Sequence, residues 1–184
     1  MLTFKEILLW LFVIDLGIAF GAGLYEQRVI HPEWFGGGSW KTGLRVDSEA
    51  MRRTDTGRRF WAYVTTVPLT LLALASMPVA LGAQAQGPVR DWWLSAAVIT
   101  ILERLGTFFF FIPTALKFMH ADLPESSAAA MASQWVRLNR MRLAFNLLGW
   151  LAALKALSVL STLNRCMFAA CANGASSLCL REFS

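Results

Sequence analysis

Four long apolar segments follow one another along the chain, and more polar stretches separate them. They cover residues of about 7–30, 60–81, 92–119 and 136–162. As helices, they match the roughly 20 apolar residues that cross a bilayer core. The pattern predicts an all-α fold, an integral membrane bundle of four antiparallel helices within residues 1–163. Residues 164–184 form a predicted polar C-terminal tail.

Proline interrupts three of the predicted helices. The first helix is expected to end at His31-Pro32, because proline disfavours the helical conformation of the residue before it. Pro68 removes a backbone donor near the start of the second helix and should kink it. Pro113 lies inside the third segment and leaves the carbonyl of Phe109 without its usual donor.

A polar stripe runs down the otherwise apolar fourth segment. Trp135, Asn139, Arg142 and Asn146 are offset by 0, 4, 7 and 11 residues, which places them on one helical face. Amide and guanidinium groups are costly in hydrocarbon, so this face should point into the bundle. Two explanations stay open: the stripe forms a functional site, or it bonds neighbouring helices together.

Helix length also predicts which polar residues share a depth. At 1.5 Å per residue, the ends of the first and third segments and the starts of the second and fourth lie on one side of the bundle. We expect the following side chains to converge at this mouth: Glu26, His31, Thr66, Thr114, Lys117, His120, Trp135, Asn139 and Arg142.

A second polar layer is predicted near mid-bilayer. Asp15 and Glu103 lie at similar depths there, and unpaired charges at that depth cost several kcal/mol. Arg104 or Lys155 should therefore neutralise them, and this layer is expected to be structural.

The mouth residues allow two interpretations. An ion pair between Glu26 and Arg142 would lock the first and fourth helices together. Alternatively, Glu26 or a histidine is the base of a pocket in which Arg142 stabilises a developing oxyanion. Phe110 belongs to the aromatic run TFFFFIP at residues 107–113, which either lines a flat apolar pocket or faces lipid.

Composition supports the membrane assignment and narrows the chemistry. The 184 residues are 56% hydrophobic, with 8 Trp and 13 Phe, and the net charge of +5 comes from cations that flank the segments. This distribution is typical of contact with lipid headgroups, and no nucleic-acid partner is expected. The three cysteines contain no C-x-x-C pair, and the histidines form no H-x-x-x-H or E-x-x-H pair, so no metal is expected.

Four stretches resemble one family of small membrane proteins. They are GAGLYEQRVIHPEW (21–34), RRFWAYVTTVPLTLLALA (58–75), FFFFIPT (108–114) and WVRLNRMR (135–142). The chain is similar over residues 5–162 to the four-helix bacterial membrane proteins related to anthrone oxygenases, a domain of unknown function. The resemblance implies a four-helix bundle. For its characterised branch, it also implies oxidation of a polycyclic anthrone to a quinone without an obvious metal or flavin motif.

The resemblance and the polar mouth together define the candidate site. The resemblance implies functional roles for Glu26, His31, Trp135, Asn139 and Arg142, which lie in the resembling stretches. The candidate catalytic residues are Glu26, His31, Asn139 and Arg142, and the candidate substrate-binding residues are Trp135, Thr66, Thr114, His120 and Phe110. The sequence indicates no particular cofactor.

Three functions fit the sequence to different degrees. The first is an oxidoreductase or oxygenase that acts on a lipophilic aromatic or quinone-like molecule. The alternative is a non-enzymatic membrane protein, either a lipid or quinone binder or a partner subunit of a membrane complex. Small-solute transport is less favoured, because four spans without an internal repeat would need to oligomerise.

Charge and glycine positions predict orientation and assembly. Basic residues concentrate on the side of loops one and three, at Lys41, Arg45, Arg52, Arg53, Arg58, Arg59, Lys117, Arg137 and Arg140. The positive-inside rule then places these loops in the cytoplasm and both termini outside, in a bacterial inner membrane. Gly17 and Gly21 form a G-x-x-x-G face that would allow close helix approach and a homo-oligomer.

Overall fold

The fold is a bundle of long helices. A computed structural model describes residues 3–36, 44–82, 87–121 and 123–173, and these ranges contain helices and no strand. Four helical stretches are long and apolar enough to cross a membrane: Phe4–Trp34, Gly57–Leu81, Pro88–His120 and Ser127–Cys166. The predicted all-α membrane bundle is confirmed at this level, and we refer to these stretches as spans one to four.

Most spans consist of several consecutive helical elements. Span one comprises α1 (Phe4–Tyr25), the π-helix η1 (Glu26–Ile30) and α2 (His31–Trp34). The short helix α3 (Ser48–Thr54) precedes span two, which comprises the π-helix η2 (Gly57–Thr66) and α4 (Val67–Leu81). Span three comprises α5 (Pro88–Gly106), the π-helix η3 (Thr107–Phe111) and α6 (Ile112–His120), and span four lies within α7 (Glu125–Asn173).

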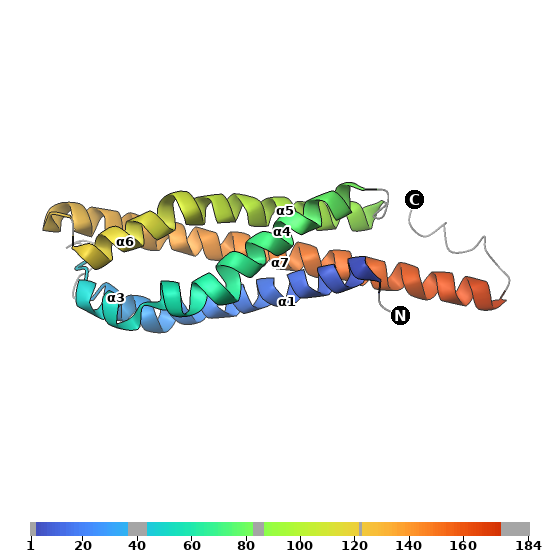
Figure 1. Ribbon diagram of the computed structural model, residues 1–184, viewed down its shortest axis with the longest axis horizontal. Helices are drawn as coiled ribbons and strands as arrows, with labels where there is room; N and C mark the ends of the chain where they lie inside the picture. Colours follow the sequence, from blue (N-terminus) through green and yellow to red (C-terminus); the bar gives the residue numbers. More distant parts are fainter. Residues whose placement is uncertain (1–2, 37–43, 83–86, 122, 174–184) are drawn as a thin grey trace.

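The four spans run lengthwise beside one another. Figure 1 shows α1 leading away from the end where the N-terminus lies, α4 returning toward it, α5 and α6 leading away again, and α7 returning. α7 packs along both α1 and α5, and α4 packs against α5 and α1. α3 and α6 lie together at the end opposite the N-terminus, where the candidate site is located.

The half of the bundle near the N-terminus is a conventional apolar core. α1 begins with a capping box, in which Thr3 and Glu6 bond each other's backbone N–H groups. Fully buried side chains such as Phe12 and Trp93 fill the centre. A Cβ atom on Gly17 would lie 3.2 Å from Trp150 of α7, so this glycine lets α1 approach α7 within the chain.

The helices extend beyond several predicted limits. Spans one and three begin at Phe4 and Pro88 rather than near residues 7 and 92, and α7 continues to Asn173 past the predicted start of the tail at residue 164. The predicted helix end at His31-Pro32 is wrong, since the helix continues through Pro32 to Trp34. The remaining tail, 174–184, lies outside the described residues.

A π-helical segment precedes each of the three prolines discussed above. Pro32, Pro68 and Pro113 are each the second residue of the α-helix that follows one. The residue before each proline donates its N–H to the carbonyl five residues back: His31 to Glu26, Val67 to Ala62 and Ile112 to Thr107. The wider turn carries the helix past a residue that has no N–H of its own. The three prolines therefore widen their helices rather than ending them.

An aromatic cluster closes the bundle at the end opposite the N-terminus, which we call the loop end. Trp34, Phe35, Phe118 and Trp135 are buried there together. Asp47 caps α3 by accepting a hydrogen bond from the Ala50 N–H at 2.8 Å. The cluster fixes α3 over the mouth of the bundle.

Candidate functional site

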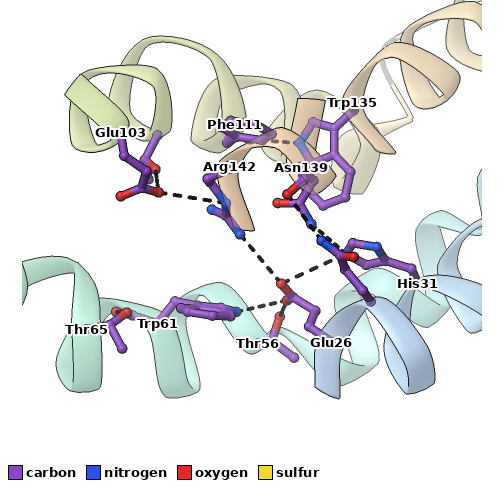
Figure 2. A network of polar contacts seen from close by, with 12 residues as sticks. Glu26, His31, Thr56, Trp61, Thr65, Glu103, Phe111, Trp135, Asn139 and Arg142 are labelled. Carbon is purple, nitrogen blue, oxygen red and sulfur yellow. Dashed lines mark hydrogen bonds and ion pairs between the residues drawn. The ribbon is translucent and has the colours of Figure 1, made fainter. Parts of the chain in front are cut away.

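The site lies where the three π-helical segments meet α7. η1 contributes Glu26, η2 contributes Trp61, and η3 contributes Thr107 and Phe111. π turns inside α-helices often occur at functional sites, because the extra residue reorients the side chains that follow it. Here they turn polar and aromatic groups from three spans toward Arg142 of α7 (Figure 2).

Glu26 is buried, and its two carboxylate oxygens have different surroundings. Oε1 accepts hydrogen bonds from the Thr56 hydroxyl at 3.0 Å and from the Trp61 indole N–H at 2.9 Å. Oε2 lies 3.9 Å from Arg142 Nη2 and 3.9 Å from His31 Nε2. Both of these distances exceed a hydrogen bond. Oε1 therefore orients the carboxylate, and Oε2 is the oxygen directed at the charged centre of the site.

Arg142 is positioned by ion pairs and aromatic faces. Its Nε lies 3.9 Å from Glu103 Oε1, on the side opposite the contact with Glu26 (Figure 2). Its guanidinium carbon lies 4.8 Å from the centre of the Phe111 ring and 5.6 Å from that of Trp61. Cation–π contacts at these distances are attractive. The guanidinium is thus held without a short hydrogen bond to either carboxylate.

A second ion pair completes the charge balance. Arg104 bonds the neighbouring Glu103 directly, and the Thr107 hydroxyl donates to Glu103 Oε1 at 3.1 Å. With Glu26 and Arg142, the cluster holds two carboxylates and two guanidinium groups, so it is formally neutral when His31 is neutral. Formal neutrality lowers the cost of placing these groups in a membrane span.

His31 and Asn139 form the third side of the site. Asn139 Nδ2 lies 3.4 Å from His31 Nε2, and the backbone carbonyl of Asn139 accepts a hydrogen bond from Gln27 Nε2 at 3.2 Å. The His31 ring packs edge-on against Trp135 with 5.0 Å between ring centres. On α7, Trp135, Asn139 and Asn146 are buried, which confirms that the stripe faces the bundle interior.

A cavity of about 380 Å³ opens beside this cluster. Such a volume lies within the usual range for small-molecule pockets. Most of its wall is apolar, and the charged side chains in the wall include Glu26, Arg104 and Arg142. Trp61, Phe111 and Trp135 contribute aromatic rings to the wall.

The predicted site residues meet only in part. Thr66, His120 and Trp135 line the cavity, as do Glu26 and Arg142. Asn139 and His31 do not line the cavity. They contact each other, and His31 also lies 3.9 Å from Glu26. Five of the predicted residues thus converge on one cavity, and the predicted Glu26–Arg142 ion pair lies in its wall.

Two predicted substrate-binding residues are not part of the cavity wall. Thr114 is buried but does not line the cavity, and Phe111 lines it in place of Phe110. An α-helical wheel from Glu103 places residues 107 and 110 inward. The π turn of η3 adds one residue, so the buried positions become Thr107 and Phe111. Phe111 therefore takes the place in the cavity wall that the α-helical spacing assigns to Phe110.

The predicted separation into two polar layers is also wrong. Glu103 pairs with Arg104 as expected, but it also reaches Arg142 and so belongs to the site. α5 begins at Pro88, four residues before the predicted start, which moves Glu103 about 6 Å toward the loop end. Lys155 is exposed on α7, and Asp15 Oδ2 is buried without a hydrogen-bond partner.

Sequence reasoning also missed Thr56 and Trp61. Both hold Glu26 Oε1, and Trp61 also faces Arg142. An α-helical wheel does not place Trp61 on the face of Thr66, five residues later, whereas η2 has the wider π geometry. A proline two residues after the end of each π-helical segment was the available signal for such a turn.

Two further observations complete the description of the site. Among the described residues, no group of three His, Cys, Asp or Glu side chains is placed to hold a metal ion. No protein-family model matches the chain, and no curated protein or solved structure shows significant similarity to it.

Proposed function

We propose that this membrane protein binds a flat, lipophilic aromatic or quinone-like molecule in the cavity and takes a proton from it. The observation that carries the proposal is the placement of Arg142 between two carboxylates at 3.9 Å, over aromatic rings and beside a largely apolar cavity. An apolar wall with a few convergent polar groups suits such a ligand.

Glu26 is the proposed proton acceptor. Oε2 is the oxygen that Thr56 and Trp61 do not bond, and it lies 3.9 Å from Arg142, which also lines the cavity. A proton that passes from the ligand to Oε2 leaves a negative charge on the ligand oxygen, which Arg142 then stabilises. The transfer moves a charge within the cavity and adds none, so no net charge is buried by the step.

The sequence resemblance favours an oxygenase form of this reaction. For an anthrone, loss of a proton from the ring CH₂ to Glu26 gives the anthrolate anion. Dioxygen then oxidises this carbon: one oxygen atom becomes the new carbonyl, and the other leaves as water with the two hydrogens. In this scheme the chain supplies the proton acceptor, the oxyanion partner and the apolar cavity.

A non-enzymatic binding role is the second candidate. Its support is that Arg142 joins span four to spans one and three through Glu26 and Glu103. Such a network stabilises a bundle even when no reaction takes place. In this role the cavity binds a lipid or quinone without proton transfer.

Orientation and assembly belong to the same proposal. Loops one and three lie in the cytoplasm of a bacterial cell, the two termini lie outside, and the bilayer is the inner membrane. A homo-oligomer would use the exposed Gly21, because Gly17 already contacts Trp150 within the chain.

The proposed reaction is tested by adding anthrone to the protein in lipid nanodiscs. Without oxygen, the protein is expected to convert bound anthrone to anthrolate, which absorbs visible light; with oxygen, anthraquinone forms. Glu26→Gln keeps an acceptor for Thr56 and Trp61 but loses the base, and we expect a rate roughly 10²–10⁴-fold lower.

Glu33→Gln is the matched control, because Glu33 is an exposed carboxylate on the neighbouring α2. It should react like the unmodified protein. Anthrone binding without anthrolate, equal in both variants, would support the binding role instead. No binding of anthrone or anthraquinone by the unmodified protein would contradict both roles for these ligands.

A further inference from the structure

Two rows of side chains border the cavity along its length. One row follows span two and the other follows span three, each with a spacing of four residues. The rows are Arg58, Ala62 and Thr66 on η2, and Ile112, Leu116 and His120 on α6. Because the two spans run in opposite directions in Figure 1, Arg58 and His120 share the loop end, and Thr66 and Ile112 share the deeper end. We call the space between the rows the slot.

The slot exists because spans two and three separate toward the loop end. Nearer the N-terminal end, α4 packs closely against α5. At the loop end, η2 makes no extended contact with η3 or α6 among the described segments. There, α3 packs against α6 instead. The cavity lies between the separated parts, so one of its sides faces outward between the two spans.

The surroundings of the slot are apolar and exposed. On span two, the side chains of Tyr63 and Val67 are 78% and 55% exposed. On span three, those of Phe109 and Leu116 are 81% and 47% exposed. Large apolar side chains exposed on membrane-crossing helices face lipid. The deeper part of the slot therefore opens toward the hydrocarbon region.

The loop end of the slot has the opposite character. Arg58 is exposed and forms an ion pair with Asp55 at 2.8 Å, and a Cβ atom added to the adjacent Gly57 would meet no atom within 4 Å. This polar end suits the headgroup region. The slot thus changes from polar to apolar along its length, as the bilayer itself does from interface to core.

We propose that the slot is a lateral opening through which the cavity takes its ligand directly from the bilayer. The ligand class is a membrane-dissolved amphiphile: its apolar rings pass between Ala62 and Leu116, and its polar substituent lies toward Arg58 and His120. This inference rests on the proposed ligand site and adds where that ligand comes from. A ligand that partitions into lipid reaches Glu26 and Arg142 without crossing the aqueous mouth.

Three bulky substitutions separate the two routes. Ala62→Trp and Leu116→Trp narrow the slot on its apolar part, and Gly57→Trp narrows the loop-side mouth. Leu71→Trp is the control, because Leu71 is 61% exposed on α4 and does not line the cavity. Each variant is placed in nanodiscs, and the association rate of the fluorescent probe 1-aminoanthraquinone is measured by stopped flow.

The lateral route predicts that Ala62→Trp and Leu116→Trp each slow association roughly tenfold or more, while Gly57→Trp and Leu71→Trp leave it unchanged. The rate should also follow the probe concentration in the lipid, and fall when added empty vesicles dilute the probe. Thermal midpoints of all variants show whether a loss reflects misfolding, and Ala62→Phe replaces a variant that fails to fold.

Two results would overturn the lateral route. One is slow association in Gly57→Trp alone, which would place access at the aqueous mouth. The other is unchanged association in all four variants while the unmodified protein binds the probe. If the unmodified protein binds no probe, the ligand site itself is contradicted, and the access route fails with it.

Discussion

At the scale of single residues, the site combines full charge balance with long charge–charge distances. Arg142 lies 3.9 Å from both Glu26 and Glu103, whereas Arg104 bonds Glu103 directly. Direct pairing would use up the guanidinium donors. The longer distances leave Arg142 able to bond a ligand oxygen, and the rings of Phe111 and Trp61 keep it in place.

Arg142→Met tests this balance at the residue scale. The substitution leaves Glu26 and Glu103 with Arg104 alone, so one buried carboxylate loses its counter-charge. We expect the free energy of unfolding to fall by about 1–3 kcal/mol, measured by denaturant or thermal unfolding in detergent.

The double variant Arg142→Met/Glu26→Gln restores formal neutrality and should recover most of that stability, while anthrone binding stays weak. The reason for the difference is that stability depends on net charge in the site, whereas binding needs the guanidinium itself. Normal binding in the double variant would show that Arg142 serves the bundle and not the ligand.

At the scale of elements, three π turns explain how the site is assembled. Each π turn ends directly before a His-Pro, Val-Pro or Ile-Pro pair, and each contributes at least one side chain to the cavity wall. Pro78, by contrast, lies inside the regular α-helix α4, away from the cavity. A proline alone therefore does not produce the π turn, and the three prolines that follow one are those whose preceding helical segment lines the site.

Pro113→Ala should separate the π turn from helix stability. Alanine supplies the missing N–H and suits a helix better than proline, so the thermal midpoint is not expected to fall. If η3 then relaxes to an α-helix, Phe111 rotates away from Arg142, and binding of 1-aminoanthraquinone weakens roughly tenfold. Pro78→Ala is the control and should leave binding unchanged. Equal binding in Pro113→Ala would show that the π turn does not shape the cavity.

At the scale of the whole molecule, hydrophobic patterning was sufficient for the architecture. Four apolar segments of about 20 to 30 residues have few structural solutions in a bilayer, so helix number and approximate limits follow from length alone. The inward face of α7 followed from the same reasoning, because Asn139 and Arg142 are costly toward lipid.

Sequence was insufficient where local geometry departs from the ideal α-helix. The wider turn of η3 places Phe111 rather than Phe110 in the cavity wall. The earlier start of α5 brings Glu103 into the site. Trp61 was missed for the same reason, since η2 alters the spacing of its span. Wheel-based reasoning accumulates such an error at every π turn, and the site lies directly at three of them.

The proposed orientation makes a separate prediction for the whole molecule. Alkaline phosphatase fused after Asn164 should be active in a bacterial host, because the positive-inside rule places this end of α7 outside the cytoplasm. A green fluorescent protein fusion at the same position should stay dark. The reverse pattern, with a fluorescent fusion and an inactive phosphatase, would place loops one and three outside.

The central claim is that a flat lipophilic ligand binds between spans two and three beside Glu26 and Arg142. The most direct measurement is a crystal structure grown in a lipid phase with a brominated anthraquinone, whose bromine gives an anomalous signal. We predict a bromine peak inside the cavity, with the rings beside Phe111 and a carbonyl oxygen within hydrogen-bond distance of Arg142. An anomalous peak confined to the surrounding lipid, with Arg142 bonded directly to Glu26 across a closed cavity, would contradict the account.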